Sequence, residues 1–195
     1  MRQLPPLNNR LPLARLLRES RNSVNILASL GFIRPIVNEM SEDIMRLRPY
    51  TADDEEDIIQ LWRRACQKAM PRIHFEKRFE DQQKYWKTKI LSEAPKTMTI
   101  VAEWRGDVVG FMTIDWETGY LDQLVVASEF WRSSVGELLL SEAKWLSPTG
   151  VDLDVDPNNG HAVRFFEKHK FVKTGDVKNG PDGPIQNMQW HPKNP

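Results

Sequence analysis

The chain has 195 residues, which suits one domain of ordinary size and is short for two. Hydrophobic residues make up 40% and charged residues 28%, which is typical of a globular protein. The sequence has no run of about 18 apolar residues, so no membrane-spanning helix is expected. Lysine plus arginine (27) equals aspartate plus glutamate (27), so nucleic acid is not the expected partner. The single cysteine, Cys66, indicates a reducing compartment such as the cytoplasm, and the four scattered histidines predict no metal site.

Residues 1–40 differ in composition from the rest of the chain. They carry six arginines, no lysine and only two acids, and prolines interrupt any long helix. We interpret them as a flexible or non-native extension, with regular patterning from Met40 or Met45 onward. A transit peptide and a basic arm that docks nucleic acid are the alternatives. The remaining residues, 45–195, are expected to form the folded domain.

The first predicted elements are a strand and two helices. Residues 45–49 alternate apolar and basic side chains, as a strand does. Thr51 followed by four acids predicts a helix start with a solvated first turn rather than a metal site. Apolar residues from Ile58 to Ala69 recur at helical spacing and predict its buried face. A second helix is expected over residues 75–92.

The period then changes, and short strands dominate. Strands are expected at 98–103 and 108–114, joined by a hairpin at 104–107, and then at 120–126, 151–155, 171–174 and 185–190. Helices are expected at 134–145 and 159–169, and a Gly- and Pro-rich loop at 175–184. This order predicts an α+β domain built on one central sheet.

A strand followed by a loop of small residues and a leucine-rich helix marks the first candidate site, at residues 124–140. Ser133, Ser134 and Gly136 let a ligand approach the backbone closely. The free N–H groups of the first helical turn bind anions such as pyrophosphate, and Arg132 adds positive charge. An ordinary crossover with a Ser-capped helix accounts for this segment equally well.

A second segment decides between these interpretations. Residues 159–171 read Asn-x-x-Ala-x-x-Phe-Phe-Glu-Lys-x-x-Phe after a short strand, and the chain closes on Pro-x-x-x-Met-x-Trp at 184–190. Together with the loop before Gly136, these motifs resemble the GNAT superfamily of acetyl-CoA-dependent N-acetyltransferases over residues 45–190. The resemblance implies a three-layer α/β/α domain around a mixed, mostly antiparallel sheet whose fourth and fifth strands splay apart.

The resemblance also implies where acetyl-CoA lies as co-substrate, with no metal. The pantetheine would pair with the fourth strand, the loop and helix start would wrap the pyrophosphate, Asn159 would contact the cofactor arm, and the two phenylalanines would line the thiol end. The implied cofactor-binding residues are Leu124, Val125, Val126, Trp131, Arg132, Ser133, Ser134, Val135, Gly136, Glu137, Asn159, Ala162, Phe165 and Phe166.

The chain departs from the family pattern at two important positions. Ser134 stands where the first glycine of the loop belongs, which keeps the N–H but loses conformational freedom. Phe166 stands where many members have the tyrosine that protonates the departing CoA thiolate. Because phenylalanine has no proton to give, either water is the donor or the domain only binds acyl-CoA.

Candidate bases lie on the strands before the loop. Asp122 is preferred as the catalytic group because strict alternation would place it on the same face as Leu124 and Val126. Asp115 and Glu117, at the end of the preceding strand, are alternatives. The acceptor pocket is expected from the first two helices, the loop at Trp116 and Glu117, and the 175–184 loop.

These observations predict an enzyme that transfers an acetyl group from acetyl-CoA to a primary amine by direct attack in a ternary complex. The acceptor is a small molecule or a peptide; no membrane is involved, and a homodimer is left open. Cys66 is expected in the core rather than as a nucleophile. The competing hypothesis is a non-catalytic acyl-CoA-binding or regulatory module.

Overall fold

The computed structural model describes residues 45–69, 84, 96–180 and 183–192, all within the unit formed by residues 36–195. Its strands are β1 (Met45–Pro49), β2 (Thr97–Trp104), β3 (Asp107–Asp115), β4 (Tyr120–Val126), β5 (Val151–Val155), β6 (Val172–Gly180) and β7 (Gly183–Trp190). Its helices are α3 (Glu55–Ala69), α5 (Val135–Leu146) and α6 (Gly160–Lys168), with short 3₁₀ turns η2 (Ala52–Asp54) and η3 (Ser128–Phe130). The predicted 75–92 helix, apart from Lys84, and the 1–40 extension lie outside these residues.

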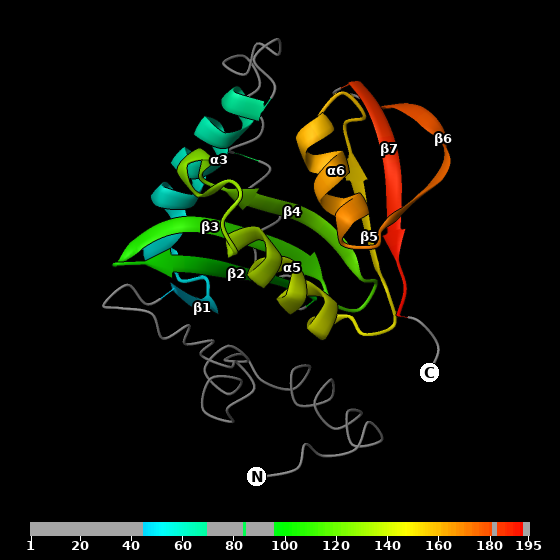
Figure 1. Ribbon diagram of the computed structural model, residues 1–195. Helices are drawn as coiled ribbons and strands as arrows, with labels where there is room; N and C mark the ends of the chain where they lie inside the picture. Colours follow the sequence, from blue (N-terminus) through cyan, green and yellow to red (C-terminus); the bar gives the residue numbers. More distant parts are fainter. Residues whose placement is uncertain (1–44, 70–83, 85–95, 181–182, 193–195) are drawn as a thin grey trace, which may run out of the picture. The chain divides into compact units, whose positions relative to one another are not determined.

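The strands form one sheet in the order β1-β2-β3-β4-β5-β7-β6. All neighbours are antiparallel except β4 and β5, which are parallel. Figure 1 shows β5, β7 and β6 turning away from the direction of β2, β3 and β4. The predicted α+β class and the mixed, mostly antiparallel sheet are confirmed.

Each face of the sheet carries its own apolar core, because strand side chains alternate between faces. One face packs against α5 and α6 through residues such as Met112, Leu139 and Leu153. The other packs Val101, Phe111 and Val125 against α3. The face of α3 that is buried is the one predicted from its spacing, with the exception of Ala69, which is half-buried. The result is a three-layer arrangement with the sheet in the middle.

The start of α3 differs from the prediction of a solvated acidic turn. Asp54 is buried, and Arg48 donates two hydrogen bonds of 2.7 Å to its carboxylate. The Thr51 backbone N–H also donates to that carboxylate, at 2.8 Å. Arg48 additionally bonds Glu103 at 2.6 Å. One of the four acids therefore joins α3 to β1 and β2, because a cation from the neighbouring strand compensates its burial.

Two turns show where local sequence was and was not sufficient. The β2–β3 hairpin closes through Arg105 and Gly106, both at positive φ (53° and 89°), as predicted for this turn. The predicted loop at 175–184 is wrong, because β6 continues to Gly180 and pairs with β7 as a hairpin. A register shift between Thr174 and Lys178, with Gly175 at φ 64°, lets the strand resume after an interruption.

None of the helices in the described part of the chain is long and apolar enough to cross a membrane. Among these same residues, no group of three or more His, Cys, Asp and Glu side chains is placed to hold a metal ion.

Candidate functional site

In the described part of the sheet, the β4–β5 boundary is where neighbouring strands part around a cavity. The two strands share a single register pair, Tyr120 with Asp152, and the Asp152 N–H donates to the Gly119 carbonyl at 3.0 Å. Beyond this pair they separate, and a cavity of about 610 Å³ lies between them. The splayed fourth and fifth strands expected from the sequence are therefore confirmed.

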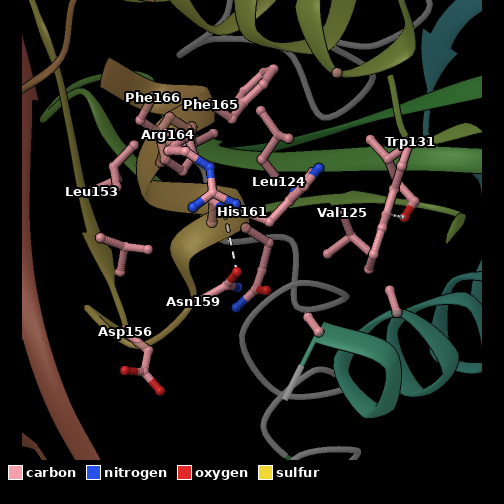
Figure 2. A pocket seen from close by; sticks show the side chains of 18 of the residues that line it. Leu124, Val125, Trp131, Leu153, Asp156, Asn159, His161, Arg164, Phe165 and Phe166 are labelled. Atoms are coloured by element: carbon pink, nitrogen blue, oxygen red, sulfur yellow. Dashed lines mark hydrogen bonds between the residues drawn. The ribbon is translucent and has the colours of Figure 1, made fainter. Parts of the chain in front are cut away.

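Five elements, α3, β4, α5, β5 and α6, line this cavity together with the β4–α5 loop and the turn after β5. Figure 2 shows side chains from β4, β5 and α6 converging on it, with Trp131 of the β4–α5 loop at one side. The α3 helix contributes Ala65, Cys66 and Ala69. The edge of β4 that faces the opening has backbone groups with no neighbouring strand, so a ligand with amide groups can pair with it.

Trp131 closes part of the far end of β4. Its indole N–H donates to the Val126 carbonyl at 2.9 Å. Its ring stacks on His161 of α6, with centroids 4.9 Å apart and planes 25° apart. The carbonyl of Val126 is thus already hydrogen-bonded, and the loop is tied to α6 across the opening.

The start of α5 presents backbone to the cavity. The Ser134 side chain makes no capping hydrogen bond, although the Ser133 hydroxyl accepts from the Val135 N–H at 3.3 Å. A Cβ added at Gly136 would lie 3.3 Å from the Phe165 ring, so α5 and α6 approach each other through this glycine. Exposed N–H groups at a helix N-terminus attract anions, which favours an anion site here.

The basic side chains of the cavity all come from one side, which is formed by the β4–α5 loop and α6. Arg132, Arg164 and Lys168 come from the loop and α6, and only Lys168 is paired there, with Glu137 at 2.9 Å. Neither Arg132 nor Arg164 has a partner among the residues that the structure describes. The Lys168 ammonium keeps the pKa of Glu137 below its usual value. The helix side of the cavity can therefore neutralise a bound anion.

The aromatic end of α6 is packed rather than polar. Phe166 is 8% exposed and makes edge-to-face contacts with Phe165 and Phe171, each at 5.3 Å between ring centroids. Asn159 caps the helix, its Oδ1 accepting from the Ala162 N–H at 3.1 Å. Asn159 and Phe166 both line the cavity. The Phe166 ring has no proton to donate to a leaving group.

A β-bulge in β4 changes the expected geometry at Asp122. Thr113 pairs with Gln123 but Ile114 pairs with Leu121, so Asp122 is the extra residue. Leu121 and Leu124 consequently share the α5 face, and the strict alternation used to orient Asp122 is interrupted there. Asp122 nevertheless lines the cavity.

Most of the predicted site residues come together here. The cavity is lined by Asp122, Leu124, Val125, Val126, Trp131, Arg132, Ser133, Gly136, Glu137, Asn159, Ala162, Phe165 and Phe166. The buried Val135 and the exposed Ser134 are not among the lining residues. Neither are Trp116 and Glu117, which lie in the β3–β4 turn, where Glu117 pairs with Lys96.

Sequence reasoning missed several lining residues. Asp154 belongs to an alternating strand, Val151–Val155, whose polar positions could have been considered as a ligand-facing set. His161 and Arg164 follow Asn159 on the helix that was already singled out. His169, at the end of the same helix, is not a lining residue but is half-buried against Phe165, with ring centroids 4.6 Å apart.

Cys66 packs against the core on the α3 face, as expected, but it is only half-buried because it also lines the cavity. Burial raises the pKa of its thiol to about 12, so the thiolate is scarce at neutral pH. The residue forms part of the wall and is not suited to act as a nucleophile.

Comparisons with known proteins agree with this geometry. The acetyltransferase (GNAT) family model matches residues 56–171. The fold is similar to an N-acetyltransferase from Thermoplasma acidophilum solved with coenzyme A, at 19% identity and TM-score 0.61, over 75% of this chain and 99% of that one. It is also similar to YjaB from Escherichia coli (21% identity, TM-score 0.61, 75% and 97% covered).

A third similar structure is a ribosomal-protein-alanine N-acetyltransferase from Brucella melitensis, at 16% identity and TM-score 0.54, over 74% of this chain and 98% of that one. At these identities the three likenesses show a common fold. No curated protein sequence matches the chain significantly.

Proposed function

Since the chain belongs to the acetyltransferase (GNAT) family, we propose that it transfers an acetyl group from acetyl-CoA to a primary amine of a small molecule or a peptide. The observation that carries the proposal is the cavity between the parted β4 and β5, with the N-terminus of α5 and two unpaired arginines on its helix side. This arrangement matches a long ligand that has amide groups in the middle and phosphates at one end.

The pyrophosphate would bind at the start of α5. The N–H groups of Gly136 and Glu137 belong to the first turn and have no acceptor one helical turn back within α5. Arg132 and Arg164 supply positive charge beside them. Small residues in this loop let the phosphate oxygens reach the backbone, so Ser134 can serve the purpose of the glycine that the family pattern has at this position, with the small Ser133 beside it.

The pantetheine would lie along β4. Leu124 and Val125 offer backbone groups at the unpaired edge, in the manner of an added strand. The Val126 carbonyl already accepts from Trp131, so the pairing is centred on the residues before it. The thioester then comes near the point where β4 and β5 begin to separate.

The reaction proposed is direct attack in a ternary complex. The amine nitrogen forms a bond to the thioester carbon, the C–S bond breaks, and the proton lost by nitrogen passes through water to Asp122. A backbone N–H at the β4 edge would stabilise the oxyanion. CoA leaves as a thiolate with a thiol pKa of roughly 8.5, and solvent returns its proton because Phe166 cannot.

The presence of phenylalanine at position 166 also supports a second candidate function. A buried aromatic cluster in place of an acid suits a module that binds acyl-CoA without turning it over. A thiol-release assay with acetyl-CoA and a panel of amines, run beside calorimetric binding of acetyl-CoA, separates the two functions. Binding with no turnover of any amine favours the module.

Asp122 is tested by replacement with asparagine. We expect Asp122→Asn to lower kcat/KM for the amine by about 10²-fold or more, the usual effect of losing a positioned base, with an unchanged Kd for acetyl-CoA. Asp176→Asn, an exposed position on β6, is the matched control. Normal turnover by the Asp122 variant would remove that residue from the mechanism.

A further inference from the structure

The strand side of the cavity is acidic, in contrast to the helix side. Its charged lining residues are Asp122 on β4, Asp154 on β5 and Asp156 just after it, and every lysine and arginine in the described lining comes from the loop or α6. Glu137, the remaining acid, is paired with Lys168. The cavity is therefore basic where the cofactor phosphates are proposed and acidic along the strands.

Asp154 lies on the opposite face of the sheet from α5 and α6. Val151, Leu153 and Val155 alternate with it and are buried in the core beneath those helices. Asp154 consequently points toward the α3 face, and α3 residues such as Ala65 line the same cavity. If acetyl-CoA occupies the side of the cavity formed by the β4–α5 loop, α5 and α6, the α3 face is the one left for the acceptor.

The carboxylate of Asp154 is held in place by neutral donors. The Tyr120 hydroxyl donates to Oδ2 at 3.2 Å, and the Asn187 amide donates to Oδ1 at 3.3 Å. Asn187 is its register partner on β7, and the same amide donates to the Leu153 carbonyl at 3.1 Å. No lysine, arginine or histidine in the described chain forms an ion pair with Asp154. An oriented and uncompensated carboxylate is well suited to bind an ammonium group.

We propose that Asp154 is a specificity-determining residue that binds a second positively charged group of the acceptor, so that the preferred acceptors are aliphatic diamines and similar dications. This inference rests on the proposed function. Asp156 lies two residues further on, so it adds negative potential along the path of the acceptor. An acceptor with a carboxylate in place of the second ammonium is disfavoured by the same groups.

Three acceptors of equal length test the charge preference: 1,4-diaminobutane, 1-aminobutane and 4-aminobutanoate. We expect kcat/KM for the diamine to exceed that for the monoamine by about tenfold beyond the statistical factor of two, the strength of one partly exposed charge-assisted hydrogen bond. The amino acid should be the poorest of the three. Equal values for diamine and monoamine would overturn the proposal.

Asp154→Asn tests the residue. The variant should raise KM for the diamine about tenfold, reduce the diamine preference nearly to the statistical factor, and leave both the saturated kcat and the Kd for acetyl-CoA within about threefold. Asp154→Glu should recover part of the preference, and Asp176→Asn should change nothing. A uniform fall in turnover for all three amines would indicate a structural role and contradict the proposal.

Binding measurements keep this inference separate from the proposed function. Calorimetry of 1,4-diaminobutane with the CoA-loaded chain reports the charge preference even if no amine is acetylated. Weaker binding by Asp154→Asn with no turnover in the wild type would support the acidic site and reject the transferase. Equal binding by both proteins would reject the assignment of Asp154.

Discussion

The boundaries on the two sides of β4 differ in construction. Toward β3, the strand is paired from Tyr120 to Val126, with the bulge at Asp122 as its one interruption. Toward β5, the pairing ends after Tyr120. The first boundary lies between two apolar cores, whereas the second opens into the cavity. One strand thus contributes to stability on one edge and to the candidate site on the other.

This contrast suggests that substitutions in the two regions should have separable effects. Changes in the closed part, β1 to β3 with the turn before α3, should lower the free energy of unfolding and leave cofactor affinity unchanged. Changes around the open boundary should alter binding or turnover and leave stability nearly unchanged. Three substitutions test this separation, in decreasing order of expected effect.

Gly136→Val should have the largest effect and belongs to the open region. Its Cβ would meet the Phe165 ring at 3.3 Å, and its methyl groups would cover the backbone where the pyrophosphate is proposed. We expect calorimetry to show a Kd for CoA about 10²-fold higher, or about 2.7 kcal/mol. Ser141→Val, at an exposed position of the same helix, is the control. An affinity within threefold of wild type would place the phosphates elsewhere.

Asp54→Asn should weaken the closed region by about 2 kcal/mol at pH 7, the range for hydrogen bonds to a charged group. Arg48 holds the pKa of Asp54 below its usual value, so the carboxylate stabilises the fold above the unfolded pKa of about 3.9, and this stabilisation is lost as the pH falls through the folded value. Denaturant titrations at neutral and acid pH measure the difference, which should shrink in acid.

The exposed neighbour Asp53 provides the control for that experiment, because Asp53→Asn removes the same charge from the same turn. The cofactor Kd should stay unchanged in both variants. A loss of CoA affinity in Asp54→Asn without a loss of stability would contradict the separation of the two regions.

Phe166→Tyr should have the smallest effect, an increase in kcat of about tenfold, or about 1.4 kcal/mol. This lies below the usual contribution of a positioned acid because a thiolate needs little assistance. Phe165→Tyr, its partly exposed neighbour, controls for a general effect of the hydroxyl, and steady-state kinetics measures both. If the wild type binds acetyl-CoA without turnover and the tyrosine variant gains activity, the module is the better description of this chain.

The local sequence pattern was sufficient to predict an element where one face of that element is buried. The strand at 151–155, the buried face of α3 as far as Ala65 and the Arg-Gly turn appear as predicted because each depends on neighbours in sequence. The prediction failed where the register with a paired strand decides, because the pattern within one segment does not specify that register. β6 continues past Gly175 because β7 offers a partner, and the Asp122 bulge arises from its register with β3.

The candidate site shows the same division. Gly136 could be identified from the small residues at a helix start, and Phe165 from the motif that resembles the GNAT superfamily. The orientation of the Asp154 carboxylate could not be predicted, because the groups that hold it lie 34 and 33 residues away, at Tyr120 and Asn187. The burial of Asp54 was missed for a similar reason, since its cation is on β1.

The Gly136–Phe165 contact bears on how the width of the opening is determined. With only one register pair joining β4 to β5, the strand ladder cannot fix their separation, and the distance between α5 and α6 does so instead. The size of side chains at this helix crossing therefore acts as a spacer. Relatives could evolve tolerance for bulkier acyl groups by exchanging residues at this crossing, which also lines the cavity, while keeping the groups on β4 and β5 unchanged.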